Sequence, residues 1–161
     1  MSGAVAPRVL VQEALFDLAA ESAALTAGRT DIGGLASFVG ISRADDGLAA
    51  LVLEQYPGMT ERAIRRIAGE ACARWPLTGC TVIHRHGRLP PGAPIVLVLT
   101  ASAHRAAALE SCAFLIDWLK TGAPFWKREE FADGRPERWV EAKAEDDAAA
   151  ARWAVAGDPG A

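Results

Sequence analysis

The sequence predicts an α+β fold in which amphipathic helices pack on a mixed antiparallel sheet. Two segments, 60–75 and 102–122, repeat apolar residues at intervals of three and four, the spacing of a helix with one buried face. Around them lie apolar runs of strand length, bounded by Gly, Pro and Asp. These strands and helices are intermixed without regular β-α-β alternation, which is typical of the α+β class.

The N-terminal third of the chain is predicted to contain three strands and one short helix. The elements are a strand at 9–16, a helix from Asp17 to Ala27, a turn region at 28–34, a strand at 35–41, a polar loop at 42–47 and a strand at 48–56. Asp17 can cap the short helix with its carboxylate. The Asp46-Gly47 step favours a tight turn, so we expect the strands at 35–41 and 48–56 to form a hairpin.

The middle of the chain begins with a clear amphipathic helix at 60–75, predicted to start at a Thr60 cap and to end before Pro76. Its inward-facing residues are Ile64, Ile67, Ala68, Ala71 and Trp75. The charged residues opposite them are most simply a solvated face. Strands at 80–88 and 95–100 follow, and the second is nearly all apolar, which favours a central place in the sheet.

A long helix is predicted between a Ser102 cap and Gly122. Its buried stripe is predicted to contain Leu109, Cys112, Ala113, Ile116 and Leu119. Lys120 falls four residues after Ile116, so this spacing places it on the stripe. A lysine there is costly unless an anionic group meets it.

The C-terminal part returns to strands and ends in a helix. The elements are a strand at 125–131, a turn at 132–136, a strand at 138–143 and a last helix that opens at Glu145, Asp146 and Asp147. Because 161 residues suffice for one hydrophobic core, residues 1–155 are predicted to form a single domain. Residues 156–161 are predicted to be a flexible tail.

Composition argues against several classes of function. A formal charge of −3 does not suit a nucleic-acid binder, so any cationic pocket would be a local feature fitted to a small anion. No apolar run reaches the roughly 20 residues that cross a bilayer, and the start of the chain lacks the pattern of a secretory signal. We therefore expect a cytoplasmic protein without membrane contact.

The cysteines and histidines form no recognisable metal motif. Cys72, Cys80 and Cys112 are widely spaced, and we expect them to be small buried residues in a reducing compartment. His84 and His86 alternate on one predicted strand and face the same way, but no further ligands lie nearby. Neither a metal nor a cofactor is expected, and the two histidines are interpreted as polar packing or a subunit contact.

Six segments, taken in order, form a more specific pattern. They are Leu53–Met59, His84–Gly87, Ser102–Arg105, Trp118–Thr121, Ala123–Glu129 and Arg138–Ala142. Together they resemble the large, catalytic subunit family of molybdopterin synthase, and the similarity extends from Val9 to Trp153. No single segment is specific, but six in the same order are hard to obtain by chance.

This resemblance implies an α/β-hammerhead fold and a sulfurtransferase that converts cyclic pyranopterin monophosphate to molybdopterin. The dithiolene sulfurs would arrive as the C-terminal Gly-Gly thiocarboxylate of a small ubiquitin-like carrier subunit, which fits the lack of a convincing catalytic cysteine. The resemblance also implies a homodimer that binds two carriers to form a heterotetramer.

The same resemblance implies the site residues. It assigns catalysis to Lys120 and Lys127, as acid–base groups or as electrostatic stabilisers. The substrate-binding residues that it implies are Arg43, His104, Arg105, Arg128, Glu129, Ile41, Ser42 and Lys143, and those of the channel for the carrier tail are Phe125 and Trp126. The arginine fork of Arg43 suits a phosphate, as does the helix start at His104.

The chain departs from the family pattern at several places, three of which concern the implied binding residues. Ile41 stands where the family often has a polar residue, and the loop at 44–47 is short and acidic. Lys143 stands where the family has an arginine, which keeps the charge but loses the bidentate geometry. These departures weaken the assignment of Ile41, Ser42 and Lys143.

His104 and Lys120 cannot bind one small molecule within a single chain, because sixteen residues of helix separate them by about 24 Å. Either one end of the helix is functional, or the two ends belong to two sites, or a two-fold dimer joins them. In the dimer, His104 and Arg105 of one copy would complete the pocket that holds Lys120 and Lys127 of the other. The resemblance implies the dimer.

Two other functions stay open at this point. One is a non-catalytic scaffold that binds the carrier, and the presence of both Lys120 and Lys127 argues against it. The other is an unrelated protein that binds a phosphorylated ligand, which would not need the segment Phe125–Lys127.

Overall fold

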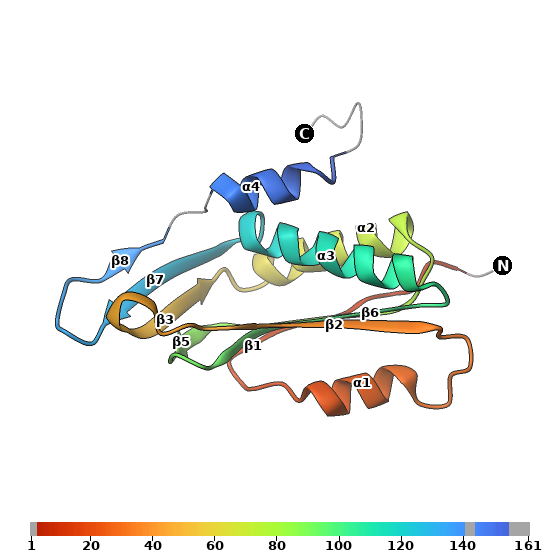
Figure 1. Cartoon of the computed structure of the whole chain (residues 1–161), viewed down its shortest axis with the longest axis horizontal. Coiled ribbons are helices and arrows are strands. Elements are labelled where there is room, and N and C mark those ends of the chain that lie inside the picture. The colour runs from red at the N-terminus through yellow and green to blue at the C-terminus, as the bar shows by residue number, and fades with distance from the viewer. Residues whose placement is uncertain (1–2, 141–143, 155–161) are drawn as a thin grey trace.

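The computed structural model describes residues 3–140 and 144–154, which form two sheets and four helices (Figure 1). The elements are β1 (Arg8–Gln12), α1 (Leu18–Thr26), β2 (Gly34–Ile41), a 3₁₀ turn (Asp45–Gly47), β3 (Leu48–Gln55), α2 (Met59–Arg74), β4 (Leu77–Arg85), β5 (Gly87–Leu89), β6 (Pro94–Ser102), α3 (Arg105–Thr121), β7 (Phe125–Phe131), β8 (Arg138–Trp139) and α4 (Ala144–Ala151). The α+β prediction is confirmed. The predicted tail at 156–161 lies outside the described residues.

The first sheet has the strand order β1-β4-β6-β2, with β1 parallel to β4 and the other pairs antiparallel. The predicted central place of the segment 95–100 is confirmed, because β6 pairs with a strand on each side. Helices α2 and α3 cover one face of this sheet and α1 covers the other (Figure 1). Neighbouring residues Val82 and Ile83 are both buried but belong to different halves of the core, as alternation along a strand requires.

The second sheet has the order β5-β3-β7-β8 and is antiparallel throughout. It lies beyond the C-terminal end of α3 (Figure 1). The predicted hairpin of strands 35–41 and 48–56 is therefore wrong, because β2 pairs with β6 and β3 pairs with β5 and β7. The loop between them crosses from one sheet to the other, with Asp46 and Gly47 in left-handed conformations at φ 53° and 73°.

The ends of the helices test three predicted caps. Asp17 caps α1 as predicted, since its Oδ1 accepts a hydrogen bond from the Ala20 N–H at 3.0 Å. Thr60 does not cap α2, because the N-cap is Gly58. The buried hydroxyl of Thr60 instead donates to the Pro124 carbonyl. Ser102 is not the N-cap of α3 either, although its hydroxyl accepts from the His104 N–H at 3.1 Å.

The buried stripe of α3 is rotated from its predicted place. Cys112 and Leu119 are buried as predicted, but Leu109 is 59% exposed and Lys120 is exposed. The stripe is centred on Ala108, Leu115 and Leu119, so a residue four positions after the half-buried Ile116 falls beyond its edge. Lys120 therefore needs no buried anion to compensate for its charge.

Two further segments differ from their predicted lengths. The first strand ends at Gln12 rather than at residue 16, and Phe16 turns back to pack against the α1 side of the sheet. Of the predicted strand at 138–143, β8 covers Arg138–Trp139, and residues 141–143 lie outside the described part. None of the described helices is long and apolar enough to span a membrane.

A candidate cationic active site

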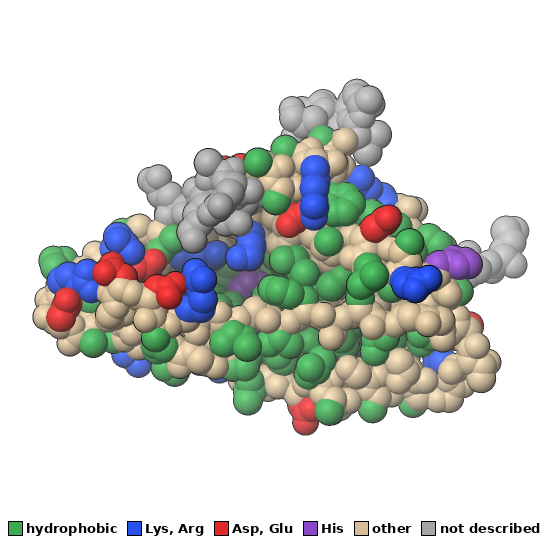
Figure 2. Space-filling model, viewed as in Figure 1, with side chains coloured by type: hydrophobic (Ala, Val, Ile, Leu, Met, Phe, Trp, Pro, Cys, Tyr) green, Lys and Arg blue, Asp and Glu red, His purple; other side chains and the backbone are tan. Residues whose placement is uncertain are grey.

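A cavity of about 300 Å³ opens where the C-terminal end of α3 meets β2 and the second sheet. Its lining residues are Phe38, Val39, Gly40, Ile41, Arg43, His84, Ile95, Val96, Ile116, Leu119, Lys120 and Lys127. Lys, Arg and His side chains gather in this hollow, left of the centre of the view in Figure 2. The structure thus brings together three cations predicted from the sequence. They are Arg43 from the loop after β2, Lys120 from α3 and Lys127 from β7.

Strand alternation decides which residues of β7 face the cavity. Lys127 lies opposite Leu53 on β3, and Phe125 and Glu129 share its face of the sheet. Trp126 and Arg128 point to the other face. There Trp126 is 52% exposed and packs edge-on against Trp139. The two residues predicted to line one carrier channel, Phe125 and Trp126, are therefore placed on opposite faces of the sheet.

A second cavity of about 390 Å³ adjoins the first and shares Arg43 and Lys127 with it. Ser42 and Glu129 also line this second cavity. The Ser42 side chain is buried, and its hydroxyl has no hydrogen-bond partner among the described residues. The predicted binding residues Ile41, Ser42, Arg43 and Glu129 thus border one continuous concave region together with Lys127.

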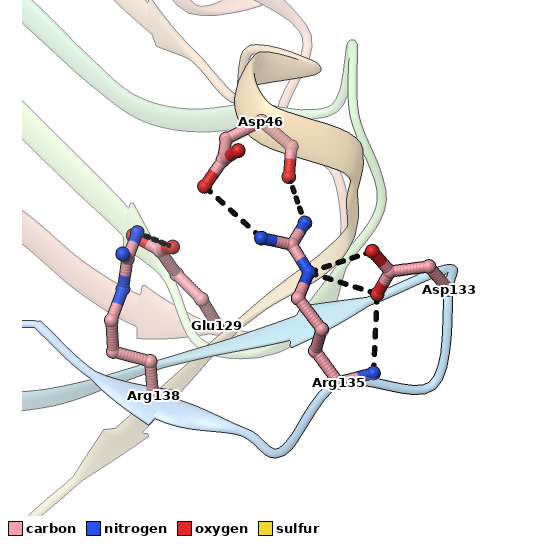
Figure 3. Close-up of polar contacts among 5 residues, drawn as sticks. All are labelled: Asp46, Glu129, Asp133, Arg135 and Arg138. Carbon is pink, nitrogen blue, oxygen red and sulfur yellow. Dashed lines mark hydrogen bonds and ion pairs between the residues drawn. The ribbon is translucent and has the colours of Figure 1, made fainter.

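Ion pairs hold the walls of this second cavity (Figure 3). Arg135 joins Asp133, at 2.7 Å, to Asp46 in the loop after β2, at 3.4 Å. Hydrogen bonds from Arg135 keep the pKa of the Asp133 carboxyl below its ordinary value. Arg138 pairs with Glu129 at 2.7 Å, so Glu129 orients an arginine. These contacts fix the loop that carries Arg43 against the turn between β7 and β8.

Two predicted arginines have different surroundings. Arg43 is exposed and pairs with Asp45 at 3.0 Å in its own loop. Arg128 lies on the far face of the second sheet, where Glu54, Glu130 and Glu137 surround its guanidinium and raise its pKa. Arg43 therefore borders the cavity, whereas Arg128 does not.

His104 and Arg105 lie at the opposite end of α3 from Lys120, and both are exposed. The sixteen residues between His104 and Lys120 correspond to about 24 Å along the helix axis. One chain therefore does not bring them to the cavity. Lys143, the remaining predicted binding residue, lies outside the described part of the chain.

The structure adds His84 to the site, although the sequence predicts polar packing or a subunit contact for this residue. His84 is 5% exposed, lines the cavity and stacks on Phe125 with ring centroids 4.1 Å apart. Burial lowers its pKa to about 4, and the nearby charge of Lys127 acts in the same direction. The imidazole is therefore neutral at pH 7. The only feature of the sequence that could have indicated the burial of His84 is the apolar strand segment around it.

This low pKa predicts a pH-dependent contribution to stability. The unfolded chain, with a histidine pKa near 6.5, binds more protons than the folded one between pH 6.5 and 4. The stability that the neutral His84 contributes is therefore fully present above pH 6.5 and is lost as the pH falls toward 4. Relative to H84Q, the wild-type free energy of unfolding should drop by about 2–3 kcal/mol between pH 7 and 4.5. Urea titrations across this range measure it, and a constant difference would contradict it.

The described cysteines do not offer a nucleophile to this site. Cys72, Cys80 and Cys112 are all buried. Burial raises the pKa of the Cys112 thiol to about 11, and a hydrogen bond with Cys72 raises that of Cys80. Within the described residues, no group of three or more His, Cys, Asp and Glu side chains is arranged to hold a metal ion.

The fold and the cavity define an α+β protein with a cationic pocket, a kind of site suited to an anionic small molecule. Residues 11–122 match the model of the MoaE protein family, more than half of the chain. The chain belongs to this family, whose members include the molybdopterin synthase catalytic subunits, and this explains the resemblance noted in the sequence.

Individual relatives agree with this assignment. The molybdopterin synthase catalytic subunit of Mesorhizobium japonicum is 58% identical over 154 residues, which cover 95% of this chain and 97% of the relative. The structure is similar to that of the molybdopterin biosynthesis MoaE protein from Burkholderia ambifaria, with a TM-score of 0.79, 52% identity and coverage of 92% and 99%. Molybdopterin synthase from Staphylococcus aureus matches with a TM-score of 0.70, 25% identity and coverage of 85% and 98%.

These findings confirm the fold, α/β-hammerhead as in the MoaE structures, and the class of activity. The chain is a sulfurtransferase subunit that acts in the synthesis of molybdopterin.

Proposed function

We propose that the cavity between α3, β2 and β7 is the active site, where cyclic pyranopterin monophosphate receives its dithiolene sulfurs. The observation that supports it is that Lys120 and Lys127, from two different elements, line one cavity with Arg43. The sulfur comes from the C-terminal Gly-Gly thiocarboxylate of a small ubiquitin-like carrier. A protein named a catalytic subunit, as the relatives are, works with a further subunit.

Each cation has a role that its position suits. Lys120, at the exposed last turn of α3, exchanges protons with the substrate as general acid and base. Lys127, half-buried on β7, stabilises the negative charge that develops as sulfur is added. Arg43 offers a planar fork to the phosphate. Ser42 and Glu129 border the same region, and Glu129 acts by holding Arg138.

A second copy of the chain completes the site. The length of α3 keeps His104 and Arg105 away from Lys120 in one chain, but a two-fold axis can bring the start of one α3 to the end of the other. His104 and Arg105 of one copy then add positive charge beside the phosphate at the other copy's cavity. The assembly is a cytoplasmic homodimer that binds two carriers, and Lys143 adds a further cation.

The remaining predicted residues have less direct roles. Phe125 supports the cavity wall through its stack with His84, which lines the cavity. Trp126 and Arg128 face the other side of the second sheet, so any contribution from them is made outside the cavity. The half-buried Ile95 and the exposed Ile41 supply an apolar wall to both cavities.

A reconstituted reaction tests this function. The chain is incubated with a thiocarboxylated carrier and the pterin precursor, and dithiolene product is measured by its fluorescent oxidation derivative. A catalytic subunit forms product. A carrier-binding scaffold would bind the carrier and form none, and an unrelated phosphate-ligand protein would bind the pterin but not the carrier. Either of these outcomes would overturn the proposal.

A further inference from the structure

The cavity is lined by several side chains that donate hydrogen bonds and by one that can accept them. The polar side chains of its described lining residues are those of Arg43, Lys120, Lys127 and His84. Arginine and lysine side chains only donate hydrogen bonds, whereas a neutral imidazole has one accepting nitrogen. Among these lining residues, His84 alone can accept a hydrogen bond through its side chain.

The hydrogen-bond pattern identifies which ring nitrogen accepts. Nδ1 of His84 lies 2.8 Å from the Arg85 carbonyl oxygen. Because a carbonyl oxygen only accepts, Nδ1 carries the hydrogen and Nε2 carries the lone pair. The stack on Phe125 holds the plane of the ring. The tautomer and the orientation are therefore both set by contacts within the chain, before any ligand binds.

Nε2 is left for a ligand from the cavity. It makes no hydrogen bond with any described residue. His84 is 5% exposed and lines the cavity. An accepting nitrogen without a partner among the described residues, on a side chain that borders a cavity, is suited to recognising a donor group.

We propose that His84 is a specificity-determining residue, whose Nε2 accepts a hydrogen bond from an N–H or O–H group of the bound pterin. This inference rests on the proposed function, because it takes the pterin as the occupant of the cavity. The cyclic pyranopterin monophosphate carries both a phosphate and ring or amino N–H donors. The cations serve the first, and the imidazole serves the second.

A histidine suits this role better than a carboxylate would. Asp or Glu at this position would form ion pairs with the lysines and reduce the positive charge that the phosphate needs. The neutral imidazole accepts without adding negative charge. Protonation would abolish acceptance, but burial and the charge of Lys127 oppose it.

Two isosteric variants separate recognition from packing. His84→Asn keeps a donor near the position of Nδ1 for the Arg85 carbonyl but has no acceptor at the position of Nε2. His84→Gln places an amide oxygen near Nε2. With the thiocarboxylated carrier in excess, H84N should raise KM for the pterin precursor roughly tenfold, because a donor loses its partner, while H84Q stays within about threefold of wild type. The Kd for the carrier should be unchanged in both, and thermal unfolding shows that both are folded.

A measurement on the wild-type chain makes the test independent of the variants. ¹⁵N NMR of the histidine side chains should show His84 as the neutral Nδ1–H tautomer, and adding the pterin precursor should shift its Nε2 resonance upfield while leaving Nδ1 in place. An unmoved Nε2 resonance at saturating pterin overturns the inference, and so does an equal rise in KM for H84N and H84Q. If the wild type forms no dithiolene product, the proposed function itself fails. If the wild type turns over and H84N matches it, only the role of His84 fails.

Discussion

Replacing Lys120 or Lys127 by alanine is expected to lower kcat by a factor of about 10² to 10⁴, the range for the loss of an acid–base group or of a charge that stabilises the transition state. The reason is that both lysines line the cavity, from α3 and from β7, and no other described lining residue besides Arg43 carries a positive charge. Dithiolene product formation with saturating carrier and pterin gives kcat.

The matched control is Arg66→Ala, which removes a cation from the exposed face of α2. Its kcat should equal that of the wild type, because Arg66 lines neither of the two cavities. If the lysine variants retained more than about a tenth of the wild-type kcat, neither lysine would act in the chemical step.

Mixing two inactive variants is expected to restore activity. A chain with His104→Ala and a chain with Lys120→Ala each lack one part of every site when they pair with themselves. In a mixed dimer, one site combines both defects and the other has neither. With random mixing half of the dimers are mixed, so about a quarter of the wild-type activity should return.

Co-expression with two affinity tags isolates the mixed dimer and sharpens this test. The purified mixed dimer should have about half of the wild-type activity per dimer, since one of two sites is intact. The control pairs Lys120→Ala with Lys127→Ala, two residues of the same cavity, and should stay inactive. Inactivity of the His104→Ala and Lys120→Ala mixture would show that both ends of α3 do not serve one site across a dimer.

Local patterns predicted several elements of the fold correctly. The Asp17 cap, the amphipathic helix over residues 60–75, the central strand at 95–100 and the strand at 125–131 all depend on propensity or on periodicity within one segment. The structure confirms each of them within a few residues.

Strand pairing and the rotation of helix α3 about its axis were harder to predict, because both depend on partners that are distant in sequence. The Asp46-Gly47 step predicted a hairpin, but β2 pairs with β6 in the first sheet and β3 pairs with β7 in the second. Similarly, the sequence predicts that the Thr60 hydroxyl caps a helix, yet in the structure it donates to the Pro124 carbonyl, which lies beside it because β7 pairs with β3. Such competition between local and tertiary partners is invisible in one segment.

The candidate site shows the same division. The resemblance of six segments singled out Arg43, Lys120 and Lys127, which the structure brings to one cavity. It also paired Phe125 with Trp126, although neighbours on a strand must face opposite sides. His84 was missed as a cavity residue because a histidine in an apolar strand gives no sign of whether it meets solvent, core or a cavity.

The sequence by itself determined the class of fold, the family and the set of cations, since composition, periodicity and ordered motifs are properties of the chain alone. Only the tertiary structure decided that Lys120 is exposed, that Trp126 and Lys127 point to opposite faces, and that His84 is a neutral acceptor at the cavity. The physical reason is that exposure, facing and pKa depend on what surrounds a side chain, and in this protein those surroundings come from β2, α3 and β7 together.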